Sequence, residues 1–254
     1  MADAAGPGLP SPATYPHPVT RRDPDCCAPP ADPHIASHFD AKVASWADVE
    51  DFPDLVDVSG SMLDLLRDAP LRRPSVLELG CGTGGLSVAL LEMGAARVTG
   101  IDLSASSIEV ARRRAAAAGH GEHASFEIGN AAEAATEPRD WVLLDRVICC
   151  YGDVERLVGR AIDLAGERIA LSVPESRGWR GLVNRPLWLA EYAWDRWFGG
   201  CRGYVHDLKR IERRLATAGF TATATARVGL WHIGVYDQAR PNMPERPDSR
   251  SRGA

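Results

Sequence analysis

The stretch that decides the fold is Glu78–Gly85, which reads ELGCGTGG. It follows a short apolar run, Ser75–Leu79, that is typical of a buried strand, and it precedes an amphipathic run, Leu86–Met93, that is typical of a helix. Glycines at such a junction let the backbone turn sharply and approach a ligand closely. We therefore expect a strand, a glycine loop and a helix whose start can hold a pyrophosphate or the carboxylate of an amino acid.

The glycine loop alone leaves the ligand open, because Gly80, Gly82 and Gly85 also fit the G-x-G-x-x-G pattern of dinucleotide-binding proteins. Asp102 lies eighteen residues after Gly84, at the end of a second expected strand over Arg97–Ile101. A carboxylate there can accept hydrogen bonds from both hydroxyls of an adenosine ribose, each worth about 1.5 to 3 kcal/mol. The pair predicts a nucleoside ligand without naming it. The alternative is that Asp102 only caps the following helix.

The chain around this loop alternates between short apolar runs and amphipathic runs, which is typical of a parallel sheet covered by helices on both faces. Capping patterns predict where the helices begin, at Ser106 with Glu109, at Asp153 and at Asp207, with ends at Gly119, Gly166 and Gly219. Further strands are expected over Ser125–Ile128, Trp141–Leu144 and Arg168–Val173, the last halted by Pro174.

The last two expected strands, Thr221–Val228 and Trp231–Tyr236, are too close in the chain for a helical crossover. They must pair antiparallel, because a parallel return needs a dozen or more residues. The sequence therefore predicts an α/β fold: a doubly wound, Rossmann-like, seven-stranded sheet, mostly parallel with one antiparallel edge strand.

With these motifs in place, the sequence resembles the class I S-adenosylmethionine-dependent methyltransferases. The resemblance rests on E-x-G-x-G-x-G at residues 78–84, on IDLS at residues 101–104, on GNA at residues 129–131 and on the closing reversed strand. It implies that the glycine loop wraps the methionine part of S-adenosylmethionine, that Asp102 holds the ribose and that Asn130 meets the adenine amino group. Family members more often have Asp at this last position, and Asn130 keeps an acceptor oxygen. The implied cofactor-binding residues are Glu78, Gly80, Cys81, Gly82, Thr83, Gly84, Asp102, Leu103, Asn130, Ala131 and Asp145.

A more distant resemblance points to the methyltransferases that esterify magnesium protoporphyrin. It rests on residues 38–40 with Trp46, on residues 144–151 and on residues 202–206. Cys149 and Cys150 stand where that subfamily usually has a histidine before the tyrosine.

An aromatic segment, residues 175–205, holds four of the seven tryptophans and is expected to form a cap over the site. Three interpretations stay open. The residues at helical spacing pack on the sheet; Trp188 and Tyr192 wall a pocket for a flat or hydrophobic acceptor; or, least favoured, the segment is an interfacial membrane helix. The residues at helical spacing are Val183, Leu187, Ala190, Trp194 and Trp197, and the flanking arginines are Arg177, Arg180, Arg185 and Arg196.

Methyl transfer chiefly requires that nucleophile, carbon and sulfur be aligned, and such positioning supplies roughly 7 to 11 kcal/mol of barrier reduction. A catalytic side chain is therefore optional. The candidates are His206, whose pKa lies near neutrality, and Tyr151, which follows the fourth strand; each has a purely structural alternative. Arg146 either grips an acceptor carboxylate or pairs with Asp145 or Asp153.

The composition indicates which partners the protein is expected to bind and where in the cell it is expected to act. A formal net charge of −5 gives no basic footprint for nucleic acid. The six cysteines lack metal-ligand spacing, so we expect no metal site and no disulfide framework. Nine of the eighteen prolines fall in residues 1–33, which predicts a disordered leader, a folded domain over 34–238 and a disordered tail over 239–254. With no secretory signal pattern and no long apolar run, a cytoplasmic location is expected.

Together these features predict a methyltransferase that uses S-adenosylmethionine to methylate a small molecule, with oxygen as the favoured acceptor atom. Two alternatives stay open: an NAD-dependent oxidoreductase and a cofactor-binding regulator without turnover. The acceptor and the oligomeric state are not identified by the sequence.

Overall fold

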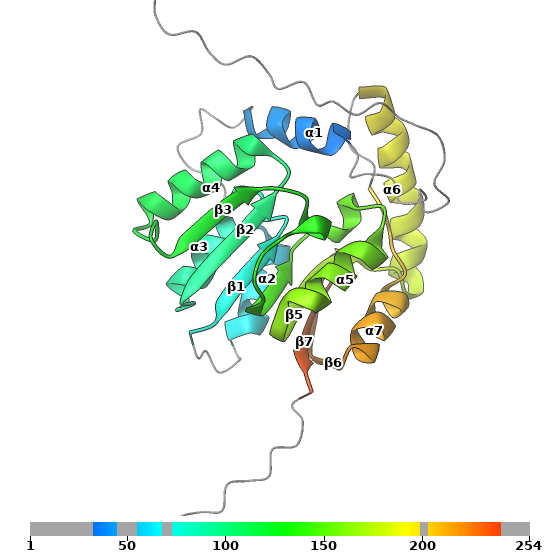
Figure 1. Cartoon of the computed structure of the whole chain (residues 1–254). Coiled ribbons are helices and arrows are strands. Elements are labelled where there is room, and N and C mark those ends of the chain that lie inside the picture. The colour runs from blue at the N-terminus through cyan, green and yellow to red at the C-terminus, as the bar shows by residue number, and fades with distance from the viewer. Residues whose placement is uncertain (1–32, 45–54, 68–72, 199–202, 240–254) are drawn as a thin grey trace, which may run out of the picture.

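A computed structural model describes residues 33–44, 55–67, 73–198 and 203–239 (Figure 1). Its centre is a seven-stranded sheet in the order β3-β2-β1-β4-β5-β7-β6. The strands β1 to β5 run parallel, and β7 is antiparallel to both of its neighbours. The bounds are Ser75–Leu79 (β1), Arg97–Asp102 (β2), Ala124–Ile128 (β3), Arg139–Leu144 (β4), Ala165–Pro174 (β5), Phe220–Val228 (β6) and Trp231–Gln238 (β7).

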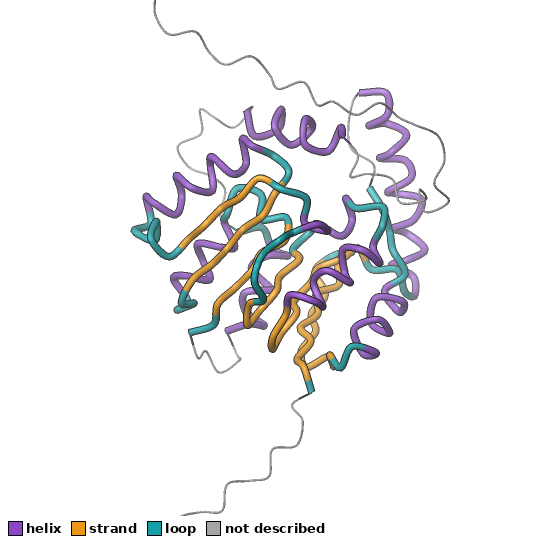
Figure 2. The backbone as a smooth tube through the Cα atoms, in the orientation of Figure 1, coloured by secondary structure: helices purple, strands orange, loops and turns teal. Residues whose placement is uncertain are grey.

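The helices cover both faces of this sheet, as the tube in Figure 2 shows. Neighbouring residues of β4 point into different layers, because side chains alternate along a strand: Val142 and Leu144 pack with α5 and α7, whereas Trp141 and Leu143 pack with α2 and α3. The bounds are Pro33–Ala44 (α1), Asp57–Arg67 (α2), Gly85–Glu92 (α3), Ala105–Ala117 (α4), Val154–Leu164 (α5), Gly178–Phe198 (α6) and Leu208–Thr217 (α7), with short 3₁₀ helices at Ala131–Glu133 (η1) and Ile148–Cys150 (η2).

The predicted fold class is confirmed. Because β6 pairs with the outer side of β7, the reversed strand lies one place in from the edge. The caps expected at Asp153 and Asp207 are present, each accepting a backbone N–H of the first turn. The expected leader and tail lie outside the described residues, apart from Pro33 at the start of α1 and Ala239 after β7.

One helix start was predicted wrongly. The chain begins α4 at Ala105, and the cap is Ser104, whose Oγ accepts the N–H of Ser107 at 3.0 Å. Ser106 is already in the first turn. The same Ser104 hydroxyl donates to Asp40 of α1 at 2.6 Å, a partner 64 residues away that the local pattern could not indicate.

The apolar stripe expected to pack on the sheet does not do so where its side chains are described. Val183 and Leu187 are 44% and 50% exposed. Trp188 meets Trp231 edge to face at 6.1 Å between ring centroids, and it does not line the cavity described below. The side chains of Tyr192, Trp194 and Trp197 lie outside the described part of the chain.

Candidate cofactor site

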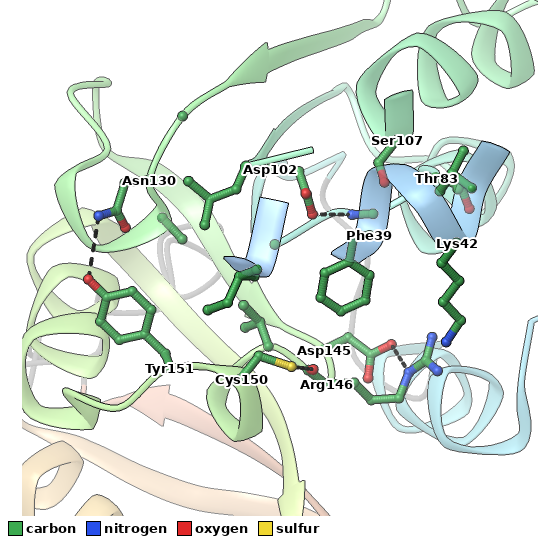
Figure 3. A pocket seen from close by; sticks show the side chains of 18 residues that line it. Phe39, Lys42, Thr83, Asp102, Ser107, Asn130, Asp145, Arg146, Cys150 and Tyr151 are labelled. Atoms are coloured by element: carbon green, nitrogen blue, oxygen red, sulfur yellow. Dashed lines mark hydrogen bonds and ion pairs between the residues drawn. The ribbon is translucent and has the colours of Figure 1, made fainter. Parts of the chain in front are cut away.

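A cavity of about 240 Å³ lies at the carboxyl ends of β1, β2 and β4. This is the point at which the strand order reverses between β1 and β4, where open α/β sheets bind their ligands. The helix α1 borders the cavity, and Figure 3 shows the side chains that surround it. The lining residues are Ile35, Phe39, Lys42, Val43, Gly80, Gly82, Thr83, Asp102, Leu103, Ser107, Gly129, Asn130, Ala131, Asp145, Arg146, Val147, Cys150 and Tyr151.

The glycine loop forms one wall of this cavity. At Gly80 the backbone has a φ of +78°, and a Cβ there would come within 2.4 Å of a methyl carbon of Val147. At Gly82, with a φ of +50°, a Cβ would meet no heavy atom within 4 Å. The first glycine therefore permits close packing against the segment after β4, and the second leaves open space in the lining where a ligand can approach the backbone.

Asp102 joins this loop to the end of β2. Its Oδ2 accepts the N–H of Gly82 at 2.8 Å, and its Oδ1 accepts the N–H of Ser104 at 2.9 Å. Burial raises the pKa of this carboxyl group, although both backbone hydrogen bonds favour its ionised form. Asp102 does not itself cap α4, because it accepts the N–H of Ser104, which is the cap residue. It also lines the cavity, and its contact with a ribose stays a prediction.

Three of the expected cofactor-binding residues, Glu78, Cys81 and Gly84, do not line the cavity. Glu78 is buried, and it accepts a hydrogen bond from the Ser87 hydroxyl of α3. Burial raises its pKa to about 8, helped by the nearby carboxylates of Asp145 and Asp102, so Glu78 is mostly protonated at neutral pH. Burial likewise raises the pKa of the Cys81 thiol. Glu78 and Cys81 are therefore buried on the side of the loop that faces away from the cavity.

The opposite end of the cavity contains Asn130 and Tyr151. Asn130 caps η1, because its Oδ1 accepts the N–H of Ala132 at 3.0 Å, and its Nδ2 donates to the Tyr151 hydroxyl at 3.5 Å (Figure 3). Leu103 and Ala131 also contribute to the lining. The side-chain amide, the phenol and the apolar neighbours suit a flat heterocycle with polar edges.

The segment after β4 contributes two charged residues to the cavity, Asp145 and Arg146. Asp145 accepts hydrogen bonds from the hydroxyls of Ser59 and Ser172. Arg146 has a φ of +53°, its N–H donates to the Ser172 hydroxyl at 2.8 Å, and its Nε lies 3.5 Å from Asp145. Of the alternatives for Arg146, the pairing with Asp145 is present. Its side chain is half-exposed, and both Arg146 and Lys42 line the cavity.

His206 does not line the cavity, unlike the other catalytic candidate, Tyr151. Its Nε2 lies 2.9 Å from the carbonyl oxygen of Tyr151, which can only accept, so Nε2 donates. The imidazole ring stacks on the Tyr204 ring, with 5.5 Å between the ring centroids. Burial lowers the pKa of the imidazole. This position suits a neutral group that braces the backbone at Tyr151, and it gives His206 no contact with a ligand in the cavity.

Sequence reasoning missed the contribution of α1. Its residues Ile35, Phe39 and Val43 recur every four positions and face the cavity together. Asp40 fastens this helix to the start of α4 by accepting the Ser104 hydroxyl at 2.6 Å and the Ser106 N–H at 3.1 Å. The spacing of the three apolar residues was a signal that could have found this face.

Comparisons with known proteins agree with this architecture. Residues 76–164 match the family model of the methyltransferase domain. Over 91 residues the chain is 37% identical to a ubiquinone biosynthesis O-methyltransferase of Sodalis glossinidius (strain morsitans), covering 35% of this chain and 36% of that protein. Over 170 residues it is 29% identical to the chloroplastic magnesium protoporphyrin IX methyltransferase of Arabidopsis thaliana, covering 64% and 51%. The chain thus spans about a third to a half of these curated relatives.

Among solved structures, magnesium protoporphyrin IX methyltransferase (ChlM) of Synechocystis PCC 6803, crystallised with bound SAH, superposes with a TM-score of 0.63 at 20% identity. The superposition covers 81% of this chain and 98% of that protein. An O-methyltransferase family protein of Burkholderia thailandensis gives a TM-score of 0.61 at 18% identity, covering 79% and 59%. Residues 76–164 thus match a methyltransferase domain, and these solved structures share the fold of this chain, in agreement with the resemblance expected from its motifs.

Two further observations concern the described residues alone. No helix among them combines the length and apolar character that crossing a membrane requires. No group of three or more His, Cys, Asp or Glu side chains among them is placed to hold a metal ion.

The protonated state of Glu78 predicts a specific pH dependence of stability. An unfolded glutamate ionises near pH 4.5, whereas the folded one keeps its proton to about pH 8. Between these values the native state binds more protons, so this group lowers the free energy of unfolding as pH rises, by at most about 1.4 kcal/mol per pH unit. The Glu78→Gln variant lacks this loss. Its stability relative to the wild type should therefore increase from pH 5 to pH 8 and level off above.

Urea denaturation at pH 5, 6.5 and 8 measures this difference. Glu109→Gln, at an exposed position of α4, is the matched control and should give the same difference at every pH. If Glu78→Gln also ran parallel to the wild type, Glu78 would titrate normally.

Proposed function

We propose that this protein transfers a methyl group from S-adenosylmethionine to a small-molecule acceptor, with an oxygen atom as the acceptor and the cytoplasm as the place of action. The observation that carries the proposal is a hydrogen bond in the wall of the cavity. The Gly82 N–H donates to Asp102 Oδ2 at 2.8 Å, at the place where the strand order reverses. The match of residues 76–164 to the methyltransferase domain supports it.

The residues around the cavity fit S-adenosylmethionine. The adenine would lie at the Asn130 end, the ribose would bond to Asp102, and the methionine part would follow the open backbone at Gly82. The amino group of the methionine part would pair with Asp145, and its carboxylate would pair with Lys42 and Arg146, all three of which line the cavity. The proposed direct contacts are Gly80, Gly82, Thr83, Asp102, Leu103, Asn130, Ala131 and Asp145, with Glu78, Cys81 and Gly84 as supports.

The acceptor would occupy the apolar part of the cavity. Ile35 and Phe39 of α1 line the cavity together with Val147 and Cys150, which suits a flat or hydrophobic molecule. When bound, S-adenosylmethionine supplies an activated methyl group, so the main task of the chain is to hold the acceptor oxygen in line with it. Tyr151 lines the cavity, and its hydroxyl can share a hydrogen bond with the acceptor oxygen. His206 would act as a positioning residue for Tyr151. An oxygen acceptor is supported by the names of the curated relatives.

Calorimetry with S-adenosylmethionine, S-adenosylhomocysteine and NAD tests the cofactor. We expect the two sulfur compounds to bind and NAD to give no heat. Asp102→Ala should weaken their binding by at least tenfold, because each lost charge-assisted hydrogen bond is worth about 1.5 to 3 kcal/mol. The exposed Asp163→Ala on α5 is the control and should bind as the wild type does. Clean titration by NAD alone would overturn the proposal.

Turnover is then measured with methyl-labelled S-adenosylmethionine and fractionated small metabolites. Label should enter an ester or ether that alkaline or acid cleavage distinguishes from an N-methyl product. Tight cofactor binding with no transfer to any fraction would favour a regulator without turnover.

A separate prediction concerns the cationic end of the cavity. Arg146→Gln should weaken binding of S-adenosylhomocysteine about tenfold, because the side chain would no longer pair with the methionine carboxylate. Adenosine has no carboxylate, so its affinity should be unchanged in the same variant, as calorimetry can measure. Equal losses for both ligands would mean that the substitution had disturbed Asp145 and the loop instead.

A further inference from the structure

Among the described residues, α6 carries five large apolar side chains that are exposed. We define the outer face of α6 as Trp179, Leu182, Val183, Leu187 and Leu189, all classed as exposed. The exposed fractions of Leu182 and Leu189 are 75% and 66%, and that of Trp179 is 60%. Exposed leucines are ordinary singly, but a continuous apolar group of this kind marks an interaction site.

The opposite side of α6 attaches the helix to the domain through few, specific contacts. The buried Asn184 donates from Nδ2 to the carbonyl oxygens of Glu175 at 2.8 Å and Leu230 at 2.9 Å. One turn further on, Trp188 packs against Trp231. These contacts fix the rotation of the helix. Because residues advance by about 100° along a helix, Leu182 and Leu189 are held on the side opposite Asn184.

Arginines lie at both boundaries of the outer face. On the helix, Arg180 and Arg185 lie about 100° to either side of its centre. The guanidinium of Arg180 lies 4.6 Å from the centre of the Trp179 ring, and its Nε donates to the Gly229 carbonyl. A cationic border is notable in a chain whose formal net charge is −5. It makes the surface complementary to an anionic partner.

We propose that α6 docks this protein on anionic lipid membranes, lying in the plane of the interface with its outer face among the acyl chains. Helices that bind in this way combine Trp and Leu on one face with Arg at the polar boundary. Tryptophan is favoured at the level of the headgroups, where one end of its ring is wet. In Figure 1, α6 lies at the edge of the molecule, beyond the end of the sheet that carries β6. This function is independent of methyl transfer.

Flotation with lipid vesicles tests the proposal on the full-length protein. The wild type should float with vesicles of phosphatidylcholine and phosphatidylglycerol, remain behind with phosphatidylcholine alone, and bind more weakly as salt is raised. Leu182→Glu combined with Leu189→Glu should abolish binding. Arg185→Gln should weaken binding about fivefold at low salt, the effect of one basic residue near an anionic surface.

Ala116→Glu combined with Ala117→Glu adds the same charge at exposed positions of α4 and should leave vesicle binding intact. All variants should bind S-adenosylhomocysteine as the wild type does, so failure of the cofactor proposal and failure of this one are separable. Absence of binding to anionic vesicles would overturn the membrane proposal, as would equal binding by the leucine variant. A dimer in sedimentation that the leucine variant abolishes, without vesicle binding, would assign the face to a second copy instead.

Discussion

The site depends on the hydrogen bond between the Gly82 N–H and the Asp102 carboxylate, 2.8 Å long. It joins the loop after β1 to the end of β2, beside the backbone bonds from Gly80 and Cys81 to the Ile101 carbonyl. A glycine-rich loop loses much conformational entropy when it is ordered, so it needs such fixed partners. Held in this way, the loop and the acidic residue form one wall, and a ligand that contacts both meets a surface that is already shaped.

The carboxyl groups around this wall have different partners. Glu78 lies deepest and is held neutral, with a pKa of about 8. Asp145 is buried too, but two serine hydroxyls and Arg146 surround it. A protonated Glu78 removes one repulsive charge from behind the loop, close to the cavity-lining Asp102 and Asp145. The same burial that costs stability as pH rises therefore keeps a negative charge from forming at Glu78, behind the loop.

The local parts of this architecture could be predicted from the sequence, because their signals are local. The strand at Ser75–Leu79, the glycine turn and the pairing of Asp102 with it all fall within one βαβ unit. The contacts that were missed join distant segments. Asp40 accepts a hydrogen bond from Ser104, 64 residues away in the chain, and His206 donates to the Tyr151 carbonyl, 55 residues away. No pattern of neighbouring side chains predicts such contacts. The local pattern predicted that Ser106 caps α4. In the structure the cap is Ser104, whose hydroxyl also donates to Asp40.

The helix α6 shows why periodicity defines a face but not its surroundings. Apolar spacing over residues 183–190 predicted correctly that one side would be hydrophobic, and packing on the sheet was the natural expectation. The sheet, however, is already covered by α2, α3, α5 and α7, and what remains at its end are the carbonyls of Glu175 and Leu230. The carbonyl of the buried Glu175 receives its donor from Asn184, whereas the Leu230 carbonyl also accepts the N–H of Glu175. With Asn184 on the inward side, the exposed Leu182 and Leu189 lie on the opposite side of α6.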